Sequence, residues 1–293
     1  MEHIIECNNL THYYGKRCIY ENLNFNVEKG RIVGLLGKNG TGKTTTINIM
    51  NGYLRPHEGE LKLFGEPAGK LSPAVKQRIA LLLEGHIQYS FMNIEQIEKF
   101  YSRFYPLWNR APYYELMGKL NIAPRQRISR MSCGQKSQVA LGLILAQNAE
   151  LLILDDFSMG LDPGYRRLFV DYLNEYVRAE GKTLFVTSHI IQDMERLIDD
   201  CIIMDYGRIV LQQPVGKLMG QFKRFRFTLQ QGNVSGIDMF YHPELIRNNM
   251  EMCAFLSLDE VRRILDDQKV LYADLRVEEL SLEDVFIGLT GKY

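Results

Sequence analysis

The chain has 293 residues and a mass of 34.0 kDa, about twice the usual size of one domain, which indicates a large domain and a smaller one. Its composition, 46% hydrophobic and 24% charged, is typical of a globular protein and excludes disordered, collagen-like and coiled-coil chains. The 35 basic residues equal the 35 acidic ones, and both sides of residue 214 are near neutrality. Because nucleic-acid-binding proteins usually carry a basic domain, we expect no nucleic-acid partner.

The cysteines are five in number, lie far apart and form no Cys-x-x-Cys pair: Cys7, Cys18, Cys133, Cys201 and Cys253. This usage is typical of a reducing compartment and predicts neither disulfides nor a zinc site. The first residues lack the basic-then-apolar pattern of a secretory signal. The longest apolar run, residues 139–146, is far shorter than the roughly 20 residues that span a bilayer. We therefore expect a cytoplasmic protein that needs another polypeptide to cross a membrane.

Short strands are predicted in the first part of the chain. Residues 3–7, 18–20 and 22–27 read as strands, with polar breaks at Asn8-Asn9 and Gly15-Lys16. Residues 31–36 form an apolar strand that ends at Gly37. A helix is expected after Gly42. Residues 85–130 have helix-like spacing and form a predicted helical insertion. We expect its aromatic side chains to be core residues: Tyr89, Phe91, Phe100, Tyr101, Phe104, Tyr105, Trp108, Tyr113 and Tyr114.

Buried strands then alternate with helices. Residues 151–154 and 183–187 are apolar strands, Asp162-Pro163 begins a helix, and residues 190–198 form another, a pattern that indicates a mainly parallel sheet. After Pro214 the pattern changes to strands at 222–229, 251–258 and 270–277 with a helix at 258–267. This part predicts a small α+β appendage. Its basic residues Lys223, Arg224 and Arg226 suit either a solvated strand face or contact with phosphates or lipid headgroups.

A glycine-rich segment carries the first chemical signal. Residues 37–44 read GKNGTGKT, which fits the motif G-x-x-x-x-G-K-[ST] between a strand and a helix. Its glycines let backbone N–H groups face a polyphosphate, and the following helix N-terminus adds partial positive charge. Lys43 is expected to reach the β- and γ-phosphates and Thr44 to offer its hydroxyl to Mg²⁺. The predicted phosphate-binding residues are Gly37, Lys38, Asn39, Gly40, Thr41, Gly42, Lys43, Thr44 and Thr45.

Two acidic residues supply the second signal. Asp155 follows the buried strand 151–154 at its C-terminal end, where ligands bind in open α/β sheets, and is the candidate metal ligand. Asp156 follows directly, in the place of a base that orients the attacking water. Together with the phosphate loop, the pair predicts a site of phosphoryl hydrolysis.

Further motifs in order resemble the nucleotide-binding subunits of ABC transporters over about residues 3–214. Residues 131–135, MSCGQ, are similar to the family's signature sequence, and residues 160–163 resemble its D-loop. His189 after the strand 183–187 resembles the switch histidine. Tyr14 is similar to the aromatic residue that stacks on adenine, although Tyr13 is adjacent and either ring could belong to the core.

The resemblance implies an α/β fold of the ABC P-loop type: a mixed, mostly parallel sheet with an antiparallel N-terminal portion and a helical subdomain at about 85–150. Residues 1–214 would form the ATP-binding domain and 215–293 a C-terminal α+β accessory domain. Two subunits, identical or different, would clasp two ATP molecules, with Ser132, Gly134 and Gln135 of each capping the nucleotide of the other and Asp162 at the contact. The resemblance also implies a membrane-spanning permease on a separate chain, with this subunit peripheral at the inner face of the membrane.

Three residues depart from the family pattern. Asp156 stands where the family has a catalytic glutamate, and since a 1 Å shift of a positioning group can cost about 100-fold, we expect slow hydrolysis. Cys133 replaces the first glycine of the signature, which predicts weaker closure. Glu84 occupies the place of a glutamine that contacts Mg²⁺, with Gln88 as the alternative residue.

The leading hypothesis is an ATPase subunit, with ATP and Mg²⁺ as cofactors, that drives a membrane transporter. The ending at residues 280–291 is similar to that of bacterial exporters of drugs, antibiotics and peptides, which favours export. One alternative is a catalytically weakened regulatory subunit of a heterodimer, which the substitutions at Asp156 and Cys133 would suit. Another is a soluble ABC ATPase without a transport function.

Overall fold

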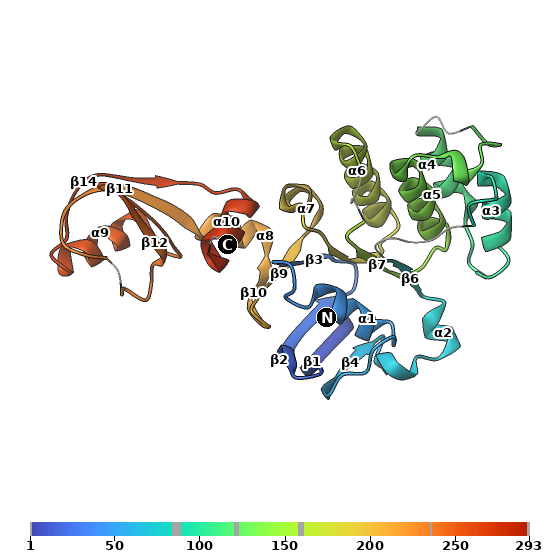
Figure 1. Cartoon of the computed structure of the whole chain (residues 1–293), viewed down its shortest axis with the longest axis horizontal. Helices are drawn as coiled ribbons and strands as arrows, with labels where there is room; N and C mark the ends of the chain where they lie inside the picture. The colour runs from blue at the N-terminus through green and yellow to red at the C-terminus, as the bar shows by residue number, and fades with distance from the viewer. Residues whose placement is uncertain (1, 84–88, 120–122, 158–160, 235, 292–293) are drawn as a thin grey trace. The chain divides into compact units, whose positions relative to one another are not determined.

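The computed structural model describes residues 2–83, 89–119, 123–157, 161–234 and 236–291. The chain divides into two compact units, Met1–Gln212 and Gln213–Tyr293, which are described separately (Figure 1). No helix within the described ranges combines the length and the apolar character needed to cross a bilayer.

The first unit begins with a long antiparallel hairpin, β1 (His3–Tyr14) and β2 (Arg17–Glu28), which β4 (Glu58–Leu63) and β5 (Glu66–Pro67) extend in the order β2-β1-β4-β5. The predicted break at Gly15-Lys16 is confirmed as the turn between β1 and β2. The break at Asn8-Asn9 and the separation of 18–20 from 22–27 are wrong, because β1 and β2 run through them. Asn9 and Asn22 have φ of 49° and 53°, a left-handed conformation that asparagine tolerates, and the pairing register shifts beside each. The polar residues therefore form bulges within continuous strands.

A second sheet has the strand order β10-β9-β3-β8-β7-β6. The predicted strands at 31–36, 151–154 and 183–187 are confirmed as β3 (Ile32–Gly37), β7 (Leu151–Asp155) and β8 (Thr183–Thr187), and their pairing is parallel. The carboxyl ends of these strands therefore meet at one edge. The remaining strands are β6 (Ile79–Leu82), β9 (Asp200–Asp205) and β10 (Arg208–Pro214).

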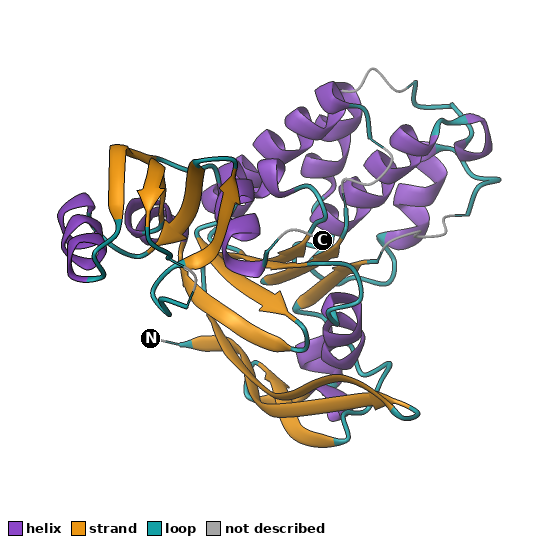
Figure 2. Ribbon diagram, turned by 60° about the vertical axis from the view of Figure 1, so that its left-hand side comes forward, coloured by secondary structure: helices purple, strands orange, loops and turns teal. Residues whose placement is uncertain are grey.

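Helices follow several of these strands. The expected helix after Gly42 is α1 (Lys43–Met50), and α6 (Pro163–Ala179) begins at the predicted Asp162-Pro163 pair. The helix predicted at 190–198 is α7 (Ile191–Leu197), while α2 (Pro73–Lys76) and a 3₁₀ turn (Ala68–Lys70) follow the first sheet. One buried cluster joins side chains from β1, β2, α1 and the second sheet, among them Phe25 and Phe185, whose rings stack at 6.1 Å. β3 and α1, the two elements that flank the loop at 38–42, both contribute side chains to this cluster. Figure 2 shows the helices and strands of the chain by colour.

The helical insertion contains α3 (Ile94–Tyr101), α4 (Arg110–Lys119), a 3₁₀ turn (Ile128–Arg130) and α5 (Cys133–Ala146). The expectation that its aromatic residues are core holds fully for Tyr113, which is completely buried, but is wrong for others. The apolar face that α3 buries consists of Ile94 and Ile97, whereas Phe100 and Tyr101 of the same helix are only half-buried. Tyr89, Phe91 and Phe104, which lie outside α3, are exposed. Edge-to-face ring contacts join the members of what we call the aromatic surface: Tyr89, Phe91, Phe100, Tyr101 and Phe104.

The second unit contains a sheet of strand order β12-β13-β11-β14 and the helices α8 (Val215–Gln221), α9 (Leu258–Asp267) and α10 (Leu282–Thr290). Its strands are β11 (Lys223–Gln231), β12 (Tyr241–Ile246), β13 (Asn249–Ala254) and β14 (Leu271–Glu278). The helix at 258–267 is confirmed. The strand predicted at 251–258 is too long, because Ser257 and Glu260 form a capping box that starts α9.

The basic residues of β11 form ion pairs within this unit. Arg224 contacts Glu251 at 3.2 Å and Asp284 at 2.9 Å, and Arg226 contacts Glu251 at 2.9 Å and Glu278 at 3.1 Å. Both guanidinium groups are thus shared between acidic partners on neighbouring elements. This arrangement matches the solvated strand face more closely than an anion-binding surface.

A test of the packing uses two helical glycines. A Cβ on Gly142 of α5 would lie 2.9 Å from the ring of Tyr113, whose hydroxyl donates to the carbonyl of Ile94, whereas a Cβ on Gly118 of α4 would meet nothing within 4 Å. We expect Gly142→Ala to lower the free energy of unfolding by about 1 kcal/mol, because overpacking outweighs the gain in helix propensity. Gly118→Ala should raise it by a few tenths of a kcal/mol. Urea unfolding of both variants checks this, and stabilisation by Gly142→Ala would contradict it.

Candidate functional site

The loop between β3 and α1 has the backbone geometry that its glycines permit. Gly40 and Gly42 have φ of +81° and +103°, and a Cβ on Gly42 would lie 2.7 Å from the buried ring of Tyr20. A Cβ on Gly37 would lie 2.6 Å from the hydroxyl of Thr41, which donates to the carbonyl of Lys38. These positions therefore accept no larger side chain without a shift of the loop.

Lys43 is the first residue of α1 and reaches back across this loop. Its Nζ donates to the carbonyl oxygens of Gly37 at 2.6 Å and Lys38 at 3.0 Å. Burial lowers the pKa of Lys43, while the carboxylates of Asp156 and Asp155 oppose that shift. The ammonium group is thus held beside the loop backbone and within the field of both acids.

Asp155 ends β7 directly opposite Thr187 of β8. The Thr187 hydroxyl donates to Asp155 Oδ1 at 2.5 Å, and the aspartate is only 3% exposed. In the described ranges no hydrogen-bond donor contacts its other oxygen, Oδ2. A buried carboxylate oxygen without a donor is costly, so this atom requires a cation or another donor.

Asp156 leaves the strand with φ of 49° and turns its side chain toward the end of β8. Its backbone N–H is shared between the carbonyl and the hydroxyl of Thr187, at 3.2 and 3.1 Å. The Nδ1 of His189 lies 2.6 and 2.8 Å from the two carboxylate oxygens, and the His189 N–H donates to Oδ1. The acid and the histidine are therefore held as a pair.

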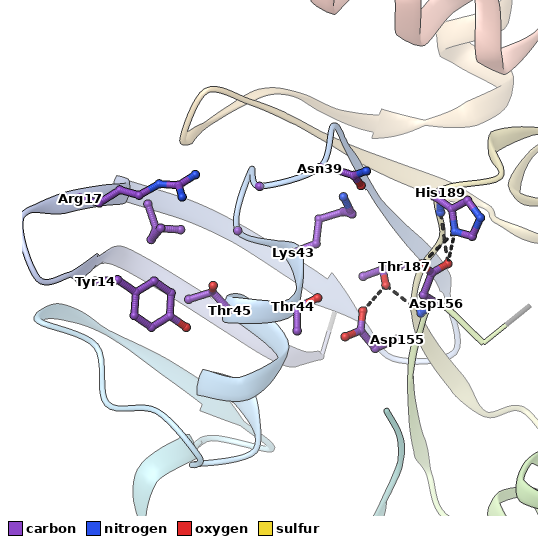
Figure 3. A pocket seen from close by; sticks show the side chains of 13 residues that line it. Tyr14, Arg17, Asn39, Lys43, Thr44, Thr45, Asp155, Asp156, Thr187 and His189 are labelled. Atoms are coloured by element: carbon purple, nitrogen blue, oxygen red, sulfur yellow. Dashed lines mark hydrogen bonds and ion pairs between the residues drawn. The ribbon is translucent and has the colours of Figure 1, made fainter. Parts of the chain in front are cut away.

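These groups meet in one pocket of about 290 Å³ (Figure 3). Of the residues predicted for the site, the pocket is lined by Tyr14, Asn39, Gly40, Gly42, Lys43, Thr44, Thr45, Asp155, Asp156 and His189. Gly37, Lys38 and Thr41 shape the loop without lining the pocket. Arg17, Ile19 and Thr187 also line it, and sequence reasoning missed all three. The turn predicted at Gly15-Lys16 could have identified Arg17. A two-residue turn at these positions makes Arg17 the cross-strand partner of Tyr14.

The two adjacent tyrosines point to different surroundings. Tyr14 lines the pocket and is 49% exposed, with its ring edge-to-face against His12 at 5.0 Å. The Tyr13 hydroxyl instead donates to Glu21, a contact that raises the pKa of Tyr13 to about 12. Tyr14 is therefore the ring available to a ligand in this pocket.

The remaining predicted residues lie elsewhere. Ser132 and Gln135 form a capping box at the start of α5, in which the Ser132 hydroxyl accepts from the Gln135 N–H at 3.2 Å. Ser132, Gly134 and Gln135 do not line the pocket, nor does Asp162, the exposed N-cap of α6. Glu84 and its alternative Gln88 fall outside the described residues.

Comparison with known proteins relates the chain to one family. Residues 20–158 match the family model described as ABC transporter. The bacitracin transport ATP-binding protein BcrA of Bacillus licheniformis is 25% identical, over 99% of this chain and 98% of its own. The linearmycin resistance ATP-binding protein LnrL of Bacillus subtilis (strain 168) is 26% identical, over 99% of both chains. A solved ATP-binding subunit of an ABC transporter has the same fold, with a TM-score of 0.65 and 24% identity over 74% of this chain and 92% of its own. Residues 20–158 thus carry an ABC transporter domain, and the relatives that align over nearly the whole chain are named as ATP-binding proteins of bacitracin transport and linearmycin resistance.

Proposed function

We propose that this subunit hydrolyses ATP at the pocket and uses the energy to drive a separate membrane-spanning exporter. The observation that carries the proposal is the convergence of Lys43, Asp155, Asp156 and His189 in a single pocket. A phosphate loop, a metal-side acid and a paired acid and histidine are the parts that phosphoryl transfer to water needs. Members of this family are generally ATPases, which dimerise and work with membrane permeases.

Mg²⁺ fits the oxygen atoms at the inner end of the pocket. Asp155 Oδ2 is a buried carboxylate oxygen without a donor in the described part of the chain, and the Thr44 side chain lines the same pocket. No group of three or more His, Cys, Asp or Glu side chains in that part could hold a metal by itself. This suits Mg²⁺, which is usually bound by one or two carboxylates together with substrate phosphates. When bound, the ion would neutralise charge on the β- and γ-phosphates, and Glu84 remains a proposed further ligand.

Asp156 is the proposed positioning group for the attacking water, and His189 is the proposed residue that orients it. The contacts of 2.6 and 2.8 Å between His189 Nδ1 and the carboxylate support this pairing. The aspartate is one methylene shorter than the family's glutamate, so its oxygens stay closer to the strand end. We infer slow turnover from this difference in reach, because catalysis depends steeply on the position of the reacting groups.

Ser132, Gly134 and Gln135 are proposed to act on the nucleotide of a second subunit. Their placement at the start of α5, outside the pocket of their own chain, supports this division. Because a helix N-terminus offers unpaired N–H groups and partial positive charge, it suits the terminal phosphate of a nucleotide bound to the other subunit. Asp162, exposed at the start of α6, is the proposed dimer contact.

The aromatic surface is the proposed docking site for the permease. Phe91 is 68% and Phe104 63% exposed, and each ring contacts another ring of the cluster, so the cluster presents aromatic side chains to the surface. Aromatic side chains commonly dominate the binding energy of protein interfaces. The subunit would then be peripheral at the inner face of the membrane. Since BcrA and LnrL are named for bacitracin transport and linearmycin resistance, we infer a drug, an antibiotic or a peptide as the transported substance.

Tyr14 is expected to stack on adenine. Tyr14→Ala should weaken ATP binding by about tenfold, because stacking of a base on an aromatic ring contributes about 1–3 kcal/mol. Tyr13→Ala is the matched control and should change the ATP dissociation constant by less than about twofold, because Tyr13 does not line the pocket. Calorimetric titration with ATP measures both. A larger loss from Tyr13→Ala would contradict the assignment.

Asp156 is expected to limit turnover by its short reach. Asp156→Glu should raise the ATPase kcat of the purified chain by up to about 100-fold, and Asp156→Asn should abolish hydrolysis while ATP still binds. Asp171→Glu on the exposed side of α6 adds the same methylene away from the pocket and should leave kcat unchanged. Phosphate release at saturating ATP is the measurement. If Asp156→Glu is no faster than the native chain, the proposed role is wrong.

The aromatic surface is expected to hold the permease. Tagged protein purified from detergent-solubilised membranes should co-elute with a membrane-spanning polypeptide in near-equal amount. The double variant Phe91→Ala/Phe104→Ala should lose at least about 90% of that polypeptide, as expected when interface hot spots are truncated. Tyr53→Ala removes a ring that is 65% exposed outside this surface and should have no effect. Unchanged recovery with the double variant would contradict the docking site, and recovery with ribosomes alone would contradict the transporter.

A further inference from the structure

We propose that Arg17 binds the phosphate groups of the nucleotide and makes the pocket selective for nucleotides over nucleosides. The proposal rests on the nucleotide site described above. Arg17 belongs to none of the motifs by which the site was recognised, and its assignment depends on the hairpin of β1 and β2. It joins Lys43 as a second cationic side chain lining the pocket.

The hairpin places Arg17 beside Tyr14. The two residues are direct partners in the antiparallel register, and the turn between them consists of Gly15, with φ of 62°, and Lys16. Tyr14 and Arg17 therefore leave the same end of the hairpin, and both line the pocket (Figure 3). A nucleotide whose base stacks on Tyr14 extends its phosphates toward Lys43, and Arg17 borders that path.

The guanidinium group also lies close to the phosphate loop. A Cβ built on Gly40 would be 3.5 Å from Nη2 of Arg17. Gly40 has φ of +81° and presents only backbone on this side, so no side chain separates Arg17 from the loop. Arg17 thus borders the pocket at the loop that the motif assigns to phosphate.

A second cation would offset the negative charge of the carboxylates that line the pocket. Asp155 and Asp156 place two carboxylates in the space that a polyphosphate would approach, and Lys43 is the only cation of the phosphate motif that lines it. The Arg17 side chain is exposed, and among the described residues it takes part in neither an ion pair nor a side-chain hydrogen bond. Its guanidinium keeps its charge and presents a planar fork of donors that matches phosphate oxygens.

The test compares ligands that share the base and differ in phosphates. The purified full chain and the variants Arg17→Gln, Arg17→Lys and Lys16→Gln are titrated with ATP and ADP by calorimetry, and with adenosine by ligand-detected NMR. Arg17→Gln should weaken ATP and ADP by about tenfold, as expected for the loss of a charge-assisted hydrogen bond, and leave adenosine within about twofold. Arg17→Lys should recover part of the loss. Lys16→Gln removes the neighbouring charge, which does not line the pocket, and should leave all three ligands within about twofold.

Each other result overturns the proposal in a distinguishable way. Native affinity of Arg17→Gln for ATP and ADP would show that the guanidinium does not contact phosphate. An equal loss for adenosine would show that Arg17 only supports the hairpin and Tyr14. An equal loss from Lys16→Gln would reduce the effect to general surface charge. Failure of the native chain to bind ATP would overturn the nucleotide site itself and the role of Arg17 with it.

Discussion

The hydrogen bond between Thr187 and Asp155 fixes the relation between two strands on which the pocket depends. Because β7 and β8 are parallel and in this register, one hydroxyl holds the Asp155 carboxylate and also accepts the Asp156 N–H. A slip by one residue would turn Asp155 to the opposite face of the sheet. His189, two residues beyond Thr187, would lose Asp156 in the same slip. Asp155 and Asp156 therefore face the phosphate loop only when the buried apolar strands β7 and β8 pair in this register.

The sequence predicts those parts of the site that need fixed residue types at fixed spacing. The phosphate loop is recognisable because Gly40 and Gly42 must adopt positive φ and Lys43 must follow at once. Asp155 is recognisable because a buried apolar strand ends there. The local sequence pattern also predicts α9, and the capping box at Ser257 sets the residue at which this helix begins.

Contacts between segments that lie far apart in the sequence cannot be predicted from local patterns. Thr187 reads as one more strand residue until β8 is paired with β7, and Arg17 reads as a surface charge until the hairpin register places it beside Tyr14. Asn9 and Asn22 look like strand ends because a polar pair is a common turn signal, yet tertiary pairing carries the strands through them as bulges. The aromatic surface was misjudged for a related reason: periodicity identifies a helix face without saying what covers it.

The backbone of Asp156 adds a conformational constraint to the chemistry of its side chain. Its φ of 49° lies in the left-handed region, where aspartate is several-fold enriched over most other residues because its short polar side chain can satisfy nearby backbone groups. A longer acid at this turn would give up part of that local preference in exchange for reach. An aspartate at this position thus favours the left-handed backbone at the end of β7, whereas a glutamate would favour a longer reach of the carboxylate. With the slow turnover proposed for Asp156, this choice of acid would favour long residence of the intact nucleotide, and with it a long-lived ATP-bound state, over rapid cycling.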